Sequence, residues 1–292
     1  MKKEIESFFD IVQRYRVVFF DAYGVLRNFY GLLEGVSESL KRLKQLGVSY
    51  YVITNDASSS PYDLSLAYGD DEDQNLVEEE NIISSGMLTR DFLMAKVPPG
   101  QVAYLGPAGS DYYLSTSYHS PIPMREVDDI EALRAIVLLD DEGFDWSASL
   151  NQIVNLVRNL NLPVLIANPD LSYPTGGKDI AVAVGALGTI VEIVSQKKML
   201  RFGKPDTLMF SYALEKAQKK NAGLQKKDIL MVGDTLSTDI LGANKFGIDT
   251  ALVLTGNTLK SNCQRMIDSS GIIPDYILPQ IGIPSRSQHF DH

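Results

Sequence analysis

RVVFFDAYGVLRN, residues 16–28, joins a buried strand to a turn and places one carboxylate where the two meet. Val17–Phe20 are four consecutive apolar residues, the pattern of a parallel strand that is covered on both faces. Gly24 interrupts the apolar run, so Asp21 is expected at the carboxyl end of the strand. In open α/β sheets, ligands bind at that edge. The stretch therefore predicts an α/β fold with a functional aspartate at position 21.

Three later segments carry polar side chains to the same edge of the predicted sheet. They are VSYYVIT (48–54), RFGKPD (201–206) and GDTLSTD (233–239). The first follows a predicted helix over residues 36–46, and a strand, a helix and a second strand in one sheet form a right-handed parallel unit. The last follows the predicted strand DILMV, residues 228–232. The candidate site residues are therefore Asp21, Thr54, Asn55, Lys204, Asp234 and Asp239.

A second run of α/β elements separates the two halves of this pattern. Strands are predicted for QVAYL (101–105), AIVLL (135–139) and PVLIA (163–167), with a helix between the last two. The first pattern resumes at RFGKPD. We therefore expect a Rossmann-like parallel-sheet core from residues 1–83 and 200–292, interrupted by an inserted α/β domain, residues 84–199.

Two further segments are assigned from the spacing or length of their apolar residues. Ile5, Phe8, Phe9 and Val12 have the spacing of an amphipathic helix, which predicts an N-terminal helix packed on the core. The apolar run IAVAVGALGTIVEIV, residues 180–194, is shorter than a bilayer span and contains Glu192. It predicts a buried helix or strand, and no membrane role is expected.

The composition of the chain bears on which partners and which cellular compartment are expected. The chain has 292 residues, with 27 Lys and Arg against 37 Asp and Glu, so its formal net charge is −10. This balance argues against a nucleic-acid partner. A single cysteine cannot form an internal disulfide, and the first residues lack the apolar core of a signal peptide. We therefore expect a cytoplasmic protein. Its oligomeric state is open, with a homodimer as one alternative.

The candidate residue types suit transfer of a phosphoryl group. A carboxylate can attack phosphorus to form an aspartyl-phosphate, and a hydroxyl and an ammonium group can hold the phosphoryl oxygens. Further carboxylates can bind Mg²⁺, which prefers hard oxygen ligands and keeps several waters. Without such a cation, Asp21 would repel an anionic phosphate.

The motifs FFDAYGVLRN, VITNDAS, FGKPD and MVGDTLSTD resemble, in order, the four motifs of the haloacid dehalogenase superfamily of phosphatases. The inserted segment, with ANPDLSYPT from Ala167, resembles the class IIA branch of nitrophenyl-phosphatase and sugar-phosphatase type enzymes, which carry a C2 cap. The resemblance covers nearly the whole chain. It implies a core with an inserted cap, phosphatase activity on a small phosphorylated metabolite, and Mg²⁺ as cofactor.

The resemblance also implies a role for each candidate residue. Asp21 would be the nucleophile, Thr54 and Lys204 would hold the phosphate, and Asn55 would orient the phosphate or the leaving group. The metal would be bound by Asp21, Asp234 and the backbone carbonyl of Tyr23. Asp239 would bind it through water or orient the other ligands.

Tyr23 departs from the pattern of the family. Phosphatases of this family carry a second aspartate there, which protonates the leaving oxygen and later activates water. A phenol with a pKa of about 10 is a poor base near neutrality, and loss of an acid/base group costs roughly a hundred- to ten-thousand-fold in rate. Two alternatives therefore stay open beside a Mg²⁺-dependent phosphatase. One is a dehalogenase that uses Asp21 to attack carbon, and the other is a phospho-ligand binding protein with little turnover.

Overall fold

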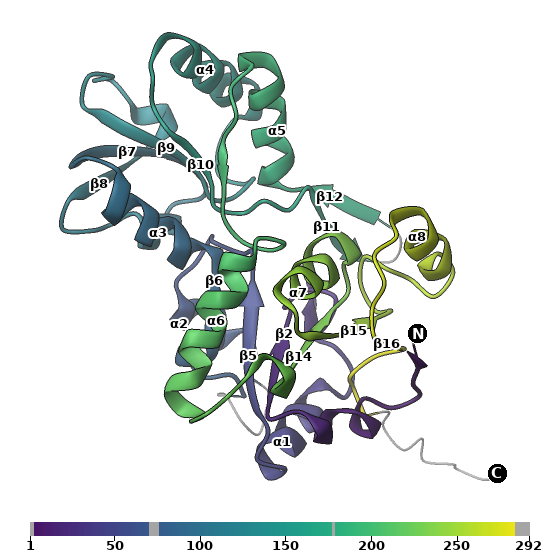
Figure 1. Ribbon diagram of the computed structural model, residues 1–292. Helices are drawn as coiled ribbons and strands as arrows, with labels where there is room; N and C mark the ends of the chain where they lie inside the picture. The colour runs from purple at the N-terminus through teal and green to yellow at the C-terminus, as the bar shows by residue number, and fades with distance from the viewer. Residues whose placement is uncertain (1–2, 70–75, 177–178, 284–292) are drawn as a thin grey trace.

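The computed structural model describes residues 3–69, 76–176 and 179–283, and its larger sheet has seven strands. The strands of this sheet lie in the order β1 (Lys3–Glu4), β16 (Tyr276–Leu278), β15 (Asp249–Val253), β14 (Ile229–Gly233), β2 (Val17–Phe20), β5 (Ser49–Thr54) and β6 (Ile82–Ser84). Every neighbouring pair is parallel. The predicted Rossmann-like sheet is therefore confirmed, with β14 at its centre and β2 inside the sheet between β14 and β5 (Figure 1).

Helices cover both faces of this sheet. Successive side chains of β2 point to opposite faces, and all four are apolar, so both faces must be buried. The helices of this unit are α1 (Val36–Gln45), α2 (Pro61–Leu66), α6 (Thr207–Lys220), α7 (Leu241–Phe246) and α8 (Cys263–Ser270). Phe19 belongs to the same buried cluster as Phe210 of α6. Phe20 belongs to a second cluster, which contains Leu40 of α1. Burial on both faces explains why this strand reads as an unbroken apolar run.

A second, five-stranded parallel sheet lies in the segment between β6 and α6. Its order is β13 (Leu200–Arg201), β10 (Val164–Ile166), β9 (Leu133–Leu138), β7 (Gly100–Leu105) and β8 (His119–Pro123). Helices α4 (Trp146–Asn159) and α5 (Val184–Ser195) cover one face, and α3 (Ser85–Lys96) packs on the other. Figure 1 shows this unit stacked above the larger sheet. Residues 200–201, at the expected return to the core, still pair with β10 of the inserted unit.

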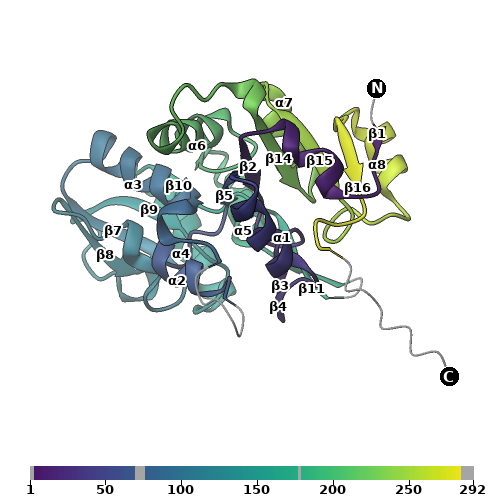
Figure 2. The ribbon, with the colours of Figure 1, turned by 90° about the horizontal axis from the view of Figure 1, so that it is seen from below.

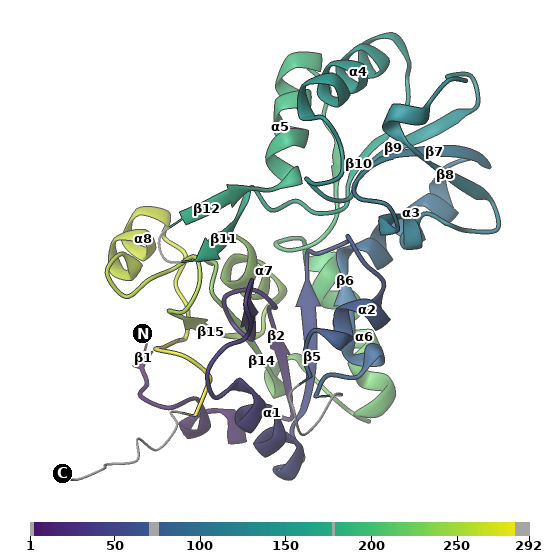
Figure 3. The ribbon, with the colours of Figure 1, turned by 180° about the vertical axis from the view of Figure 1, so that it is seen from behind.

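Two antiparallel hairpins lie where the two units meet. One joins β3 (Arg27–Asn28) to β4 (Gly31–Leu32), directly after the turn that follows β2. The other joins β11 (Ser172–Gly176) to β12 (Asp179–Val182) and extends from the inserted unit. Strand β11 contacts β3, and Figures 2 and 3 show the longer hairpin reaching toward the larger sheet. The inserted unit therefore overhangs the carboxyl ends of the core strands.

The N-terminal segment differs from the sequence-based prediction. Instead of one α-helix it forms β1 followed by two 3₁₀ turns, Phe8–Asp10 and Val12–Arg14. Phe8, Phe9 and Val12 are buried as predicted, whereas Ile5 is only partly buried. Pairing of β1 with β16 holds the first described residues extended, and the Ser7 side chain caps the first turn. Tertiary pairing thus overrode the helical spacing.

The apolar run at residues 180–194 divides between two kinds of element. Its first residues form β12, and the rest form α5. Within the described residues, none of the helices combines the length and the apolar character needed to cross a bilayer.

Among the described residues, the remaining short elements are four 3₁₀ turns and one π-helical turn. The 3₁₀ turns are Glu79–Asn81, Ser110–Tyr113, Met124–Glu126 and Lys226–Asp228. The π-helical turn, η7 (Leu236–Ile240), lies just after β14. π-Helical turns are rare and recur at functional sites, so η7 marks the carboxyl end of β14 as a candidate site.

Candidate active site

Asp21 lies at the end of β2, on the edge of the sheet that the inserted unit overhangs. Its backbone N–H donates to the carbonyl oxygen of Val232, which extends the pairing with β14 by one residue. The Oδ1 atom of Asp21 accepts a hydrogen bond from the backbone N–H of Ala22 at 2.7 Å. The Asp21 side chain keeps 16% of its surface exposed, so it remains accessible to a ligand.

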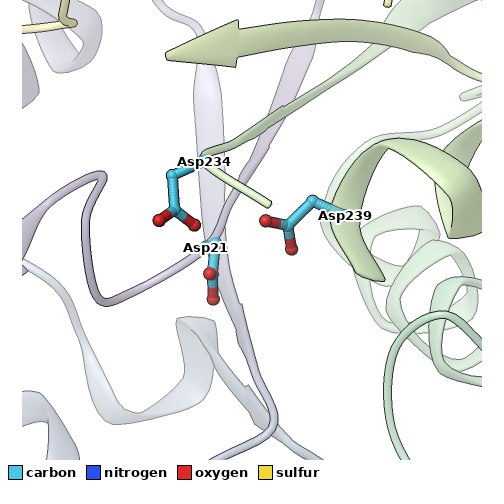
Figure 4. A group of neighbouring side chains, drawn as sticks. All are labelled: Asp21, Asp234 and Asp239. Atoms are coloured by element: carbon cyan, nitrogen blue, oxygen red, sulfur yellow. The ribbon is translucent and has the colours of Figure 1, made fainter. Parts of the chain in front are cut away.

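Asp234 and Asp239 come from the adjacent strand end and lie beside Asp21. Asp234 follows β14 directly, and Asp239 belongs to η7. The three aspartates each contribute one carboxylate oxygen to a group whose members lie within 4.8 Å of one another (Figure 4). Asp234 and Asp239 are fully buried. The structure thus brings together three carboxylates that the sequence spreads over 218 positions (239 − 21).

Backbone and hydroxyl donors fix the two buried carboxylates. Asp234 accepts hydrogen bonds from the Thr235 hydroxyl at 2.9 Å and from the backbone N–H of Asn257. Asp239 accepts one from the backbone N–H of Thr235 at 3.0 Å. The Asn257 side chain in turn donates to the Thr235 hydroxyl at 2.8 Å. The loop after β15 therefore completes the site, which the sequence analysis did not foresee.

Two glycines leave room for Asp234. A Cβ on Gly24 would lie 2.5 Å from Asp234 Oδ2, and one on Gly256 would overlap the same oxygen. Gly24 also has φ +79°, a conformation that other residues rarely adopt. The turn after β2 and the loop after β15 thus approach the carboxylate from two sides.

The three carboxylates of Asp21, Asp234 and Asp239 repel one another. Burial, followed by repulsion from Asp21, raises the pKa of Asp234 to about 7. The same causes raise the pKa of Asp239 well above its usual range. Buried carboxylates that repel one another are stabilised by a bound cation, and oxygen donors from two neighbouring loops suit a hard divalent ion. The donor set therefore fits a divalent metal.

Lys204 supplies a buried positive charge. Its Nζ atom lies 2.5 Å from Asp21 Oδ1 and 2.8 Å from Asp239 Oδ1. Only 2% of the Lys204 side chain is exposed. Burial alone would lower the pKa of Lys204, but attraction to Asp21 and Asp239 outweighs it and raises the pKa above its ordinary value. Lys204 is therefore held as an ammonium ion at the site.

Thr54 and Asn55 lie at the end of β5, the strand next to β2. Thr54 is buried, and its Oγ1 accepts a hydrogen bond from the backbone N–H of Asp56 at 3.1 Å. Asn55 is also buried, and its side chain contacts the main chain of Lys204 and the carboxylate of Asp170. Asp170 belongs to the inserted unit, so this contact joins the two units.

Tyr23 is partly buried in the turn between Asp21 and β3. The guanidinium carbon of Arg27 lies 5.1 Å from the centroid of its ring. Burial raises the pKa of the Tyr23 hydroxyl above 10, although Arg27 opposes the shift. The phenol is therefore uncharged at neutral pH and cannot act there as a carboxylate would.

Comparisons with known proteins agree with this arrangement. Residues 18–117 match a family described as haloacid dehalogenase-like hydrolase, and residues 201–282 match one described as HAD-hydrolase-like. Human chronophin is 27% identical over 93% of each chain. The ribonucleotide monophosphatase NagD of Escherichia coli K12 is 26% identical over 89% of this chain and 94% of its own.

A solved structure carries the comparison further. It is titled a possible sugar phosphatase of the HAD superfamily from Cytophaga hutchinsonii, and it superposes with a TM-score of 0.90. The two sequences are 44% identical, with 96% of this chain and 99% of the other covered. Identity at this level over two whole chains extends the likeness from the core to the cap. The chain belongs to the haloacid dehalogenase superfamily, as a phosphoric monoester hydrolase of its class IIA branch of sugar- and nitrophenyl-phosphatase type enzymes.

Proposed function

We propose that the protein is a Mg²⁺-dependent phosphatase that hydrolyses a small phosphorylated metabolite, such as a sugar phosphate, through an aspartyl-phosphate on Asp21. The observation that carries the proposal is the grouping of Asp21, Asp234 and Asp239, with the ammonium of Lys204 paired to Asp21 and Asp239. The names of the similar proteins, a sugar phosphatase and a ribonucleotide monophosphatase, support this class of substrate.

Asp21 is the proposed nucleophile because it is the most accessible carboxylate of the group. Its oxygen forms a bond to phosphorus while the bond from phosphorus to the leaving oxygen breaks, and the leaving oxygen takes up a proton from solvent water. Water then attacks the phosphorus, which releases inorganic phosphate and returns the carboxylate. Lys204 and Thr54 would hold the phosphoryl oxygens through their ammonium and hydroxyl groups during both steps.

Mg²⁺ would be held by Asp21, Asp234 and the backbone carbonyl of Tyr23, with Asp239 orienting these groups or binding through water. Only the main chain of residue 23 is asked to bind, so tyrosine at this position does not prevent metal binding. A bound Mg²⁺ would offset the repulsion between Asp21 and an anionic phosphate.

The proposed division of labour follows the two sheets except at its boundaries, where Ser84 ends β6 of the larger sheet and residues 200–201 pair with β10 of the inserted unit. Residues 1–83 and 200–292 would form the catalytic core, and residues 84–199 the C2-type cap. The cap would close over the substrate and exclude water from Asp21 until the phosphoryl group has been transferred. Tyr23 leaves the core without the usual acid/base carboxylate, so we expect leaving groups that need protonation to react slowly.

A screen of phosphorylated metabolites with and without Mg²⁺ tests the proposal. Release of inorganic phosphate that depends on Mg²⁺ is the expected result. Metal-independent release of halide from a haloacid would favour the dehalogenase, and saturable binding without product would favour the binding protein. Either of these outcomes, without phosphate release, would overturn the proposed function.

A further inference from the structure

A carboxylate of the inserted unit reaches into the core beside the site. Asp170 lies between β10 and β11, and its Oδ1 accepts a hydrogen bond from Asn55 Nδ2 at 2.9 Å. The loop that carries Asp170 is fixed on both sides. Its backbone N–H donates to Asn168 Oδ1 at 3.0 Å, and its carbonyl oxygen accepts from the N–H of Gly185 at 3.1 Å. A Cβ on Gly185 would lie 2.5 Å from that carbonyl oxygen, so α5 packs directly against the loop.

The Asn55 side chain, which contacts Asp170, also forms two hydrogen bonds with the main chain of Lys204. The N–H of Lys204 donates to Asn55 Oδ1 at 2.7 Å, and Asn55 Nδ2 donates to the carbonyl oxygen of Lys204 at 3.1 Å. A Cβ on Gly203 would overlap Asn55 Oδ1, so a glycine is needed for so close an approach. One carboxamide thus holds both polar groups of the Lys204 main chain.

The hydrogen-bonding capacity of Asn55 decides what this side chain can do. Its amide nitrogen has two hydrogens, and both are donated, one to Asp170 and one to Lys204. Without Asp170, one donor of a buried amide would lose its partner, and such groups are costly to leave unpaired. Asp170 therefore favours the orientation of Asn55 in which its oxygen faces the Lys204 N–H.

We propose that Asp170 is a positioning residue of the active site. By holding Asn55, it fixes the main chain at Lys204 and so keeps the Lys204 ammonium between Asp21 and Asp239. The inference rests on the proposed function, because it assigns Lys204 a role in phosphoryl transfer. It also makes the core site complete only when this loop of the inserted unit is docked.

Two variants of similar size separate the hydrogen bond from packing. Asp170→Asn keeps a side-chain oxygen that can accept from Asn55, whereas Asp170→Leu fills the space without an acceptor. With 4-nitrophenyl phosphate and saturating Mg²⁺, we expect kcat to fall about ten- to a hundredfold for Asp170→Leu and to stay near wild type for Asp170→Asn. Asp170→Ala serves if the leucine variant does not fold. Equal kcat values for wild type and a folded variant without the acceptor would overturn the inference.

A double-mutant cycle with Asn55→Ala tests whether the two residues act as a unit. If Asp170 acts through Asn55, the double variant loses no more activity than Asn55→Ala alone. Losses that multiply would show that Asp170 acts independently. Asp145→Ala is the matched control, because Asp145 caps α4 in the same unit by accepting from the Ala148 N–H. It should lower the melting temperature and leave kcat unchanged.

Asp21→Asn, assayed in parallel, separates failure of this inference from failure of the proposed function. An active Asp21→Asn protein would reject the proposed mechanism itself. An inactive Asp21→Asn protein together with fully active Asp170 variants would reject the role of Asp170 alone.

Discussion

Lys204 Nζ donates to Asp21 Oδ1 at 2.5 Å, although 183 positions separate the two residues along the chain. The pair forms because the loop before α6 and the end of β2 meet at one edge of the sheet. The ammonium neutralises part of the charge on Asp21. An incoming phosphoryl group offers oxygens that can accept the same hydrogens, which would free Asp21 to attack.

Asp21→Asn should reduce hydrolysis by about a thousandfold or more, because an amide has nearly the same shape but is a poor nucleophile. The variant should stay folded, because relief of the repulsion from Asp234 and Asp239 offsets the loss of the ion pair with Lys204. Phosphate release and thermal melting of the same preparation provide the check. Activity near wild type would reject Asp21 as the nucleophile.

Asp234→Ala should weaken Mg²⁺ binding strongly, and Asp239→Ala should weaken it less. The reason is that Asp234 is the proposed direct ligand, whereas Asp239 also forms an ion pair with Lys204. Calorimetric titration with Mg²⁺ measures both affinities. Unchanged titrations in both variants would contradict the assignment.

Gly256→Ala should weaken Mg²⁺ binding by roughly ten- to a hundredfold without changing the charge of the site. The new methyl group would overlap Asp234 Oδ2 and displace the carboxylate. The titration is compared with that of Asp234→Ala, and melting confirms the fold. A folded alanine variant with wild-type affinity would mean that the loop after β15 yields without moving Asp234.

Asp140→Asn tests a carboxyl group outside the metal cluster. Burial is the main cause that raises the pKa of Asp140 from 3.8 to about 6. An acid whose pKa is higher in the folded state binds its proton more tightly there, so its contribution to stability falls as the pH rises from about 4 to 6. Asparagine does not ionise, and it keeps the acceptor that Glu142 N–H contacts at 2.9 Å.

The melting temperature of Asp140→Asn minus that of wild type should therefore increase between about pH 4 and about pH 7. Thermal melting of both proteins at several pH values across this range provides the check. A difference for Asp140→Asn that is constant with pH would refute the prediction.

Tyr23→Asp should raise turnover of an alkyl phosphate, because it restores a carboxylate where the leaving oxygen and the attacking water pass. The gain should be smaller for 4-nitrophenyl phosphate, whose leaving group needs little protonation. Tyr23→Asn is the matched control, as it has the size of aspartate without its acid. A folded Tyr23→Asp protein with no gain on either substrate would favour the dehalogenase or the binding protein.

The inner strands of the larger sheet were predictable because each is a buried apolar run with a polar residue at or just after its end, whereas β6, β8 and β16 were not predicted. Residues 17–20 and 49–54 follow this pattern. The prediction of an N-terminal helix was wrong because β1 pairs with β16, a strand more than 270 positions away in the sequence. Local spacing contains no information about such a partner.

Asp21, Thr54, Asn55 and Asp234 were found because they end or follow predicted strands, and Lys204 was found through the FGKPD motif, whereas the groups that support these residues were missed. Asn257 binds Asp234 through its backbone N–H, and a side-chain motif cannot predict a backbone hydrogen bond. A polar TGN segment after the strand at 249–253 was the available signal. Asp170 was visible only as part of a family-like motif, since its contact with Asn55 joins two separate units.

The strand order has a consequence for synthesis on the ribosome. Strand β2 pairs with β5 early, but its other neighbour, β14, begins at residue 229. At about 5–20 residues per second, translation leaves one edge of β2 unpaired for roughly ten seconds or longer. The five-stranded sheet, by contrast, draws all its strands from residues 100–201 and is complete before β14 emerges. During this interval the nascent chain carries a complete five-stranded sheet and an apolar strand, β2, whose backbone is unpaired on one side. An unpaired strand can pair with other chains, so a chaperone would protect the chain most at this stage.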